Sequence, residues 1–137
     1  MLRADGAVVG STATQLIGQF KVDYAIIGAS AIDEEGALLD FDYREVQVAQ
    51  AIIANARSVM LVADSTKLRR SAPVRIAHIS QIQTFVTDQE LPERLATICH
   101  GKGIEVMAAM PKGAEVDEAQ ADVQDAAPES APVVRLR

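Results

Sequence analysis

Four short, continuous apolar runs, separated by segments with helical periodicity, constrain the fold of this chain more than any other feature. The runs span residues 23–28, 59–63, 84–86 and 104–107. Strands that are apolar along their whole length are typical of parallel sheets, because helices cover such sheets on both faces. The sequence therefore predicts an α/β fold, a parallel sheet with flanking helices on both faces.

The segments between these runs carry the start and stop signals of three helices. Residues 11–20 begin with Ser-Thr, a preferred N-cap, and end in apolar residues on one side. A second helix is predicted after Asp42, because Asp42 and Glu45 have the spacing of a capping box. Pro92 suits the first turn of a third helix, which two glycines end before the last run.

Three other stretches lack these patterns. Residues 29–41 are expected to form a loop, and residues 68–79 a short irregular segment. Residues 111–137 consist mainly of Ala, Pro, Asp, Glu and Gln, with no aromatic residue. Because such a composition buries too little apolar surface to offset the entropy of ordering, we predict a disordered acidic tail there. The ordered unit is then expected over residues 1–110.

Composition excludes several classes of protein. A chain of 137 residues supports one ordinary domain. Its net charge of −6 argues against a direct grip on nucleic acid, whose affinity comes largely from basic side chains on phosphates. No apolar run approaches the about 18 residues of a membrane span, and the N-terminus lacks a signal-peptide pattern. The lone Cys99 suits a reducing cytoplasm, where we expect the protein.

Polar residues follow three of the four runs, at the ends where open parallel sheets bind their ligands. If the strands are neighbours, these residues meet on one rim and suit a small polar ligand. The alternative is an ordinary set of loop residues, because strand ends turn into loops. The set comprises Gly28, Ser30 and Asp33 after the first run, Asp64, Ser65, Thr66 and Lys67 after the second, and Thr87 and Asp88 after the third.

The only concentration of basic residues comprises Lys67, Arg69, Arg70 and Arg75. It suits a phosphate, since Lys provides a point charge and Arg a bidentate fork. A solvated loop or a subunit contact is the better interpretation of Arg69 and Arg70. Lys67 is the stronger candidate because it lies nearest to a strand end.

Glu45 admits two interpretations. As a capping residue it stabilises the start of a helix, and as a binding residue it accepts hydrogen bonds from a sugar's hydroxyls. Arg44 beside it is placed to hold an anion at the positive end of that helix.

The histidines and the cysteine do not form a recognisable reactive site. His78 and His100 are far apart and lack companions at metal-ligand spacing, so we expect no metal. The sequence contains no nucleotide-binding glycine motif and no nucleophile–base pair. We therefore expect neither a cofactor nor a catalytic residue.

Four motifs together resemble the effector domain of DeoR-family transcriptional repressors. They are VDYAIIG at residues 22–28, IDEEG at 32–36, REV at 44–46 and ADSTK at 63–67. The run LDFDYREV, with RSAPVR later, is most similar to the glycerol-3-phosphate regulon repressors within that family. The resemblance extends over roughly residues 2–108, and the motifs are specific as a set.

The resemblance implies a fold similar to ribose-5-phosphate isomerase and an effector that is a phosphorylated sugar or polyol. It places Asp33, Arg44, Glu45, Asp64 and Lys67 in or beside the effector pocket. Lys67 is expected to contribute charge to the phosphate, while Glu45 and Asp33 bind hydroxyls. Arg44 and Asp64 would support them.

Two parts of the family pattern have no counterpart in this sequence. The family begins with a helix-turn-helix that binds operator DNA, and the first half of its effector domain carries a Ser/Thr-rich phosphate loop. We therefore expect a truncated relative that binds DNA only through a helix-turn-helix absent here. An unpaired sheet edge in such a chain favours association into a homo-oligomer.

Two rival functions remain open at this point. The first is a sugar-phosphate isomerase, which needs positioned acids and bases. Ile27 and Ser30 stand where isomerases place aspartates, and their lysine-glycine loop is missing, so sensing is favoured over turnover. The second is an oligomerisation domain that binds no ligand.

Overall fold

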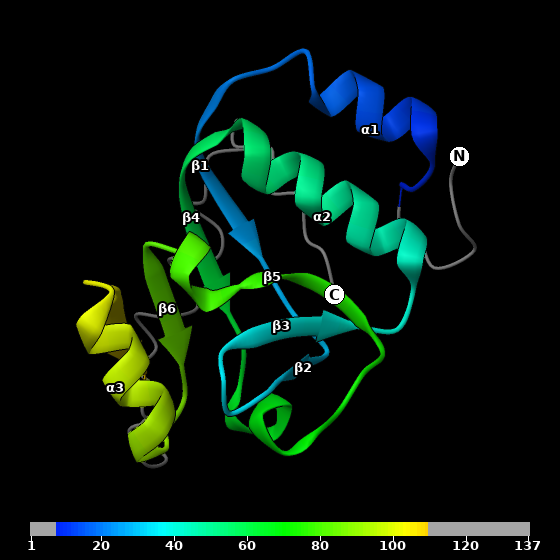
Figure 1. The fold of residues 1–137 in the computed structure, drawn as a ribbon. Coiled ribbons are helices and arrows are strands. Elements are labelled where there is room, and N and C mark those ends of the chain that lie inside the picture. The colour runs from blue at the N-terminus through cyan, green and yellow to red at the C-terminus, as the bar shows by residue number, and fades with distance from the viewer. Residues whose placement is uncertain (1–7, 110–137) are drawn as a thin grey trace, which may run out of the picture.

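A four-stranded parallel sheet forms the centre of the computed structural model, which describes residues 8–109 (Figure 1). Its strands lie in the order β1 (Val22–Ile27), β4 (Ala56–Val62), β6 (Thr84–Thr87) and β7 (Glu105–Ala108). Every pairing in this sheet is parallel. The predicted α/β class is confirmed, and the four predicted runs are its four strands. The proposed tail lies outside the described residues.

Three helices flank the sheet: α1 (Ser11–Ile17), α2 (Tyr43–Asn55) and α3 (Glu93–Gly101). Helix α2 packs on β1 and β4, and α1 lies along α2 (Figure 1). Asp42 is the N-cap of α2, and its side chain accepts a hydrogen bond from the Arg44 N–H over 2.8 Å. No helix of residues 8–109 is long and apolar enough to cross a membrane.

The stretch at residues 29–41 is a hairpin, so the prediction of a loop there is wrong. Strands β2 (Ala31–Ile32) and β3 (Ala37–Asp40) pair antiparallel through a tight turn. Strands of this length are too short to display alternation, which is why the sequence pattern does not reveal them.

The segment at residues 68–79 is also more regular than predicted. It contains β5 (Val74–His78), which pairs antiparallel with β3 and completes a second, three-stranded sheet. Short 3-10 helices precede and follow it, η1 (Ser65–Arg69) and η2 (Ile79–Gln81). The partner strand β3 is distant in sequence, and local patterns carry no information about such pairing.

Within residues 8–109, the helices cover only one face of the main sheet, whereas the sequence predicts both. Along β1, Ile27 is buried, while Tyr24 and Ile26 are 80% and 43% exposed. The alternation continues in β4, where Leu61 is buried and Val62 is exposed. We call the face that carries Tyr24, Ile26 and Val62 the open face. The covered face packs into a single core with α2, α3 and the smaller sheet.

Candidate functional site

The carboxyl ends of β4 and β6 meet at one rim, because these strands are neighbours in the sheet. The Ser65 N–H donates to Oδ1 of Asp88 over 2.7 Å, and the Ser65 hydroxyl lies 3.4 Å from Oδ2. Ser65 lies three residues after the end of β4, and Asp88 directly follows β6. The structure thus brings together two of the three polar strand ends that the sequence singles out.

Asp64 and Lys67 flank this contact at the start of η1. Asp64 caps η1 by accepting hydrogen bonds from the hydroxyl and the N–H of Thr66. These two bonds hold the pKa of Asp64 below its usual value, and the charges of Lys67 and Arg70 add to the effect. Lys67 is half-buried and has no ion pair with a described carboxylate. Its ammonium group is therefore available to an anion.

Asp40, the last residue of β3, is a buried carboxylate that is not among the site residues predicted from the sequence. The Ser30 hydroxyl donates to Oδ1 of Asp40 over 3.0 Å, and the Phe41 N–H donates to the same oxygen over 2.7 Å. Asp40 is only 6% exposed, which is unusual for a carboxylate. The sequence signal was the acidic end of an apolar run, Leu38-Leu39-Asp40, hidden inside the expected loop.

Arg44 and Glu45 lie beyond Asp40, in the first turn of α2. A guanidinium nitrogen of Arg44 is 3.4 Å from Oδ2 of Asp42. The positive charge of Arg44 is therefore partly neutralised by the carboxylate of the N-cap residue. Asp40 ends β3 and Asp42 caps α2, so these carboxylates and Arg44 lie close together in the sequence, with the exposed aromatic rings of Phe41 and Tyr43 between them. This is the second place where predicted site residues gather.

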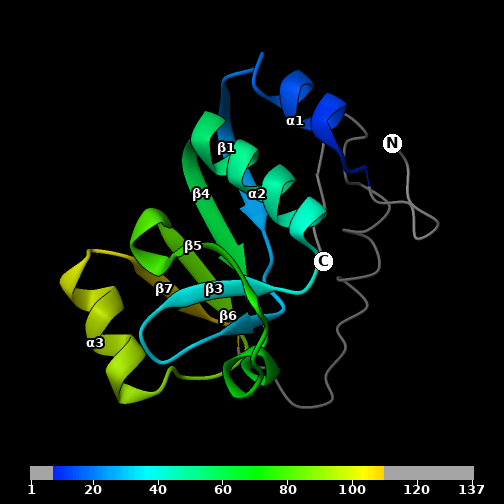
Figure 2. The ribbon, with the colours of Figure 1, turned by 45° about the vertical axis from the view of Figure 1, so that its right-hand side comes forward.

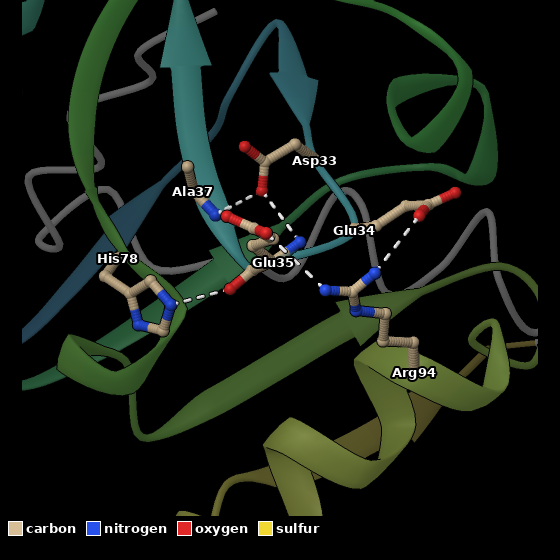
Figure 3. Close-up of polar contacts among 6 residues, drawn as sticks. All are labelled: Asp33, Glu34, Glu35, Ala37, His78 and Arg94. Carbon is tan, nitrogen blue, oxygen red and sulfur yellow. Dashed lines mark hydrogen bonds and ion pairs between the residues drawn. The ribbon is translucent and has the colours of Figure 1, made fainter.

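Asp33 lies at the opposite end of the hairpin and is not brought to Arg44 and Glu45. Its Oδ1 accepts hydrogen bonds from the N–H groups of Glu35 and Ala37, over 3.0 Å and 2.8 Å (Figure 3). The length of β3, at about 3.3 Å per residue, separates the two groups. Asp33 therefore shapes the turn at residues 33–36 of the hairpin.

Residues 33–36, which we call the anchored turn, are held by two other elements (Figure 3). Arg94 of α3 lies 3.8 Å from a carboxylate oxygen of Glu34 and 3.5 Å from one of Glu35. His78 Nε2 donates to the Glu35 carbonyl over 2.7 Å, since a carbonyl can only accept. His78 is thus a structural donor, and no group of metal-ligating side chains occurs among the described residues.

Two hollows mark the described surface, and neither contains Lys67. The larger, about 460 Å³, lies between α2 and β5, and the smaller, about 170 Å³, lies beside the anchored turn. Of the predicted site residues, Asp33 lines the smaller of these two hollows. We therefore locate the candidate site from its charged and polar side chains, at the carboxyl ends of β1 and β4. The larger hollow is lined by Gln50, Ile53, Ala54, Arg75, Ile76, Ala77, His78 and Gln81.

Comparison with known proteins gives a consistent match. Residues 1–89 match the family described as the DeoR C terminal sensor domain. The chain is 40% identical over 111 residues to the glycerol-3-phosphate regulon repressor of Haemophilus influenzae. It is 44% identical over 88 residues to the repressor of that name from Escherichia coli, and 33% identical over 103 residues to the E. coli transcriptional repressor CsqR.

The matched segments differ greatly in their share of each protein. They cover 74%, 64% and 75% of this chain, but only 43%, 35% and 40% of the three relatives. The chain thus spans less than half the length of these relatives. All three are named as transcriptional repressors, which favours the repressor interpretation of the motifs over the isomerase.

Proposed function

The chain belongs to the DeoR C-terminal sensor domain family, and from this membership we propose that it senses the effector of a transcriptional repressor. The match over residues 1–89 and the 40% and 44% identities to glycerol-3-phosphate regulon repressors carry the proposal. The effector would be a phosphorylated polyol or sugar, with glycerol-3-phosphate the first candidate. Binding to operator DNA belongs to the proposal for the whole repressor.

The effector's phosphate would bind at Lys67. This ammonium group is free of ion pairs with described residues and follows the carboxyl end of β4, the usual ligand edge of a parallel sheet. Asp64 supports it by capping η1, which holds the backbone that carries Lys67.

The effector's hydroxyls would bind to the first turn of α2. Glu45 offers a carboxylate there, and Arg44 lies beside it at the positive end of the helix. Asp33 would act indirectly, by holding the anchored turn. Its separation from Arg44 and Glu45 argues against a direct contact with the same small ligand.

Sensing requires that the effector prefer one arrangement of the repressor over another. A ligand with equal affinity for the DNA-competent and DNA-incompetent arrangements would shift neither population. Ser65 lies in the connection between β4 and η1, and its hydrogen bond to Asp88 links the segment that carries Lys67, the proposed phosphate-binding residue, to the end of β6. A phosphate that pulls on Lys67 would act on this contact.

A thermal unfolding series tests the proposal on the full chain. Glycerol-3-phosphate should raise the Tm with concentration, because a ligand that binds only the folded state adds about 2.7 kcal/mol at 100 times its Kd. Glycerol and inorganic phosphate at equal concentration are the controls for the two halves of the ligand. An equal rise with inorganic phosphate would reduce the site to a generic anion site. A cooperative transition that no compound moves would favour an oligomerisation domain without a ligand.

A further inference from the structure

The hydrogen bonds of Asp40 engage only one of its carboxylate oxygens. Oδ1 accepts from the Ser30 hydroxyl over 3.0 Å and from the Phe41 N–H over 2.7 Å. Within residues 8–109, Oδ2 accepts no hydrogen bond and Asp40 forms no ion pair. Burying a carboxylate without a cation is costly, because the group loses its hydration. The contacts inside the described chain therefore do not account for this carboxylate.

The second oxygen of Asp40 is open to solvent, although the residue as a whole is only 6% exposed. In the part of the chain that the structure describes, no side-chain oxygen or nitrogen is both shut off from solvent and without a hydrogen-bond partner. Since Oδ2 has no described partner, it belongs to the exposed fraction of the residue. Asp40 thus presents an acceptor oxygen at the surface, and the two hydrogen bonds to Oδ1 fix its position.

Ser30 places Asp40 near η1, the segment that carries Lys67. Ser30 directly precedes β2, and its N–H donates to the Leu39 carbonyl over 3.0 Å, which holds the end of β3 beside the start of β2. Strand β2 in turn lies against η1, the green coil below the hairpin in Figure 2. The free oxygen of Asp40 and the proposed phosphate-binding residue thus belong to neighbouring segments.

We propose that Asp40 and Ser30 recognise the hydroxyls of the effector, an assignment that rests on the proposed function. One hydroxyl donates to Oδ2 of Asp40. Another donates to Oγ of Ser30, whose own hydrogen is already engaged by Asp40. Acceptors on hydrogen-bonded neighbours suit hydroxyls on adjacent carbons, and they act together with Glu45 in the first turn of α2. The ligand class is a phosphorylated polyol, and a phosphate ester without hydroxyls binds less tightly.

Calorimetric titration of the full chain with two phosphate esters tests the proposal. Glycerol-3-phosphate carries neighbouring hydroxyls, whereas n-propyl phosphate has the same carbon chain and phosphate without them. The wild type should bind glycerol-3-phosphate at least about tenfold more tightly, because the lost hydrogen bond is one to a charged group. Asp40→Asn keeps an oxygen for Ser30 and Phe41 but replaces the exposed acceptor by an amide nitrogen. It should weaken binding of glycerol-3-phosphate roughly tenfold and leave binding of n-propyl phosphate unchanged.

Asp23→Asn is the matched control for this substitution. Asp23 is exposed at the amino end of β1, on the opposite edge of the sheet, where it lies 3.6 Å from Arg57. It should keep the wild-type preference for glycerol-3-phosphate. A preference that Asp40→Asn retains, or one that Asp23→Asn also loses, would overturn the proposal.

NMR on the wild type provides a second test that needs no variant. The Phe41 amide donates to the carboxylate of Asp40, so its signal should shift further with glycerol-3-phosphate than with n-propyl phosphate. The Glu35 amide donates to Asp33 at the other end of the hairpin and should keep its position with both esters. Equal shifts of the Phe41 signal with the two esters would contradict the proposed contact.

The same titrations separate this inference from the proposed function. If Lys67→Ala weakens binding of glycerol-3-phosphate and Asp40→Asn does not, the role of Asp40 is overturned and the sensor function stands. Equal wild-type affinity for the two esters would overturn the role of Asp40 and leave a phosphate site at Lys67. Binding of neither ester by the wild type would overturn both.

Discussion

The backbone N–H of Ser65 and Oδ1 of Asp88, 2.7 Å apart, join the carboxyl ends of β4 and β6. Asp88→Ala would remove the acceptor of a partly buried N–H, which costs about 1–3 kcal/mol. We expect a loss of this size in the free energy of unfolding, measured by urea denaturation. Glu90→Ala is the matched control, because Glu90 is exposed. Equal stability of the two variants would show that the contact does not secure the rim.

The covered and open faces of the sheet predict losses of stability of very different size for two adjacent isoleucines. Ile27 is 1% exposed and Ile26 is 43% exposed. Ile27→Ala should lower the free energy of unfolding by about 2–5 kcal/mol, since it leaves a cavity in the core. Ile26→Ala should cost much less. Similar losses in chemical denaturation would mean that the open face is covered in the folded protein.

Both the backbone conformation at position 36 and the atoms around it require a glycine there. Its φ is +91°, and a Cβ would lie 2.6 Å from Cγ2 of Ile79 and 3.1 Å from Nε2 of His78. Gly36→Ala should therefore lower the Tm and loosen the anchored turn. Gly101→Ala in α3 is the control, because a Cβ there meets no atom within 4 Å. The control should stabilise by about 0.4–1 kcal/mol, and the prediction is wrong if both variants behave alike.

The lowered pKa of Asp64 predicts how the stability of the folded protein depends on pH. Hydrogen bonds from Thr66 lower its pKa below 3.8, so the ionised carboxylate stabilises the folded state above that pH. The contribution is lost as the pH falls through the lowered pKa. The stability difference between wild type and Asp64→Ala should accordingly be present at pH 7 and shrink below pH 3.8. A carboxyl NMR titration should give a higher pKa in Thr66→Val, and an unchanged pKa there would contradict the assigned cause.

Local patterns were sufficient for the main sheet. The runs that became β1, β4, β6 and β7 are apolar and bounded by turn residues, and Asp42 is a typical N-cap. Local patterns do not predict the smaller sheet, because β2 and β3 are short and because β3 pairs with β5 across a long interval of sequence. The sequence predicts helices on both faces of the sheet, whereas the described helices cover one face. An apolar run shows that the side chains are apolar, but it does not show what packs against them.

The sequence predicts which side chains gather at the candidate site better than it predicts how they are arranged in space. The positions of Asp64, Ser65 and Lys67 follow from the strand that precedes them. The separation of Asp33 from Glu45 depends on the hairpin, which the sequence pattern does not reveal. The burial of Asp40 and the role of His78 depend on tertiary contacts in the same way.

The affinity of the full chain for glycerol-3-phosphate, measured by isothermal titration calorimetry, tests the central claim most directly. Lys67→Ala removes a charge-assisted hydrogen bond worth about 1.5–3 kcal/mol, so it should weaken binding at least about tenfold. Lys102→Ala, at an exposed site after α3, should bind as the wild type does. Binding by the wild type and by Lys67→Ala with equal affinity, or by neither, would contradict the account.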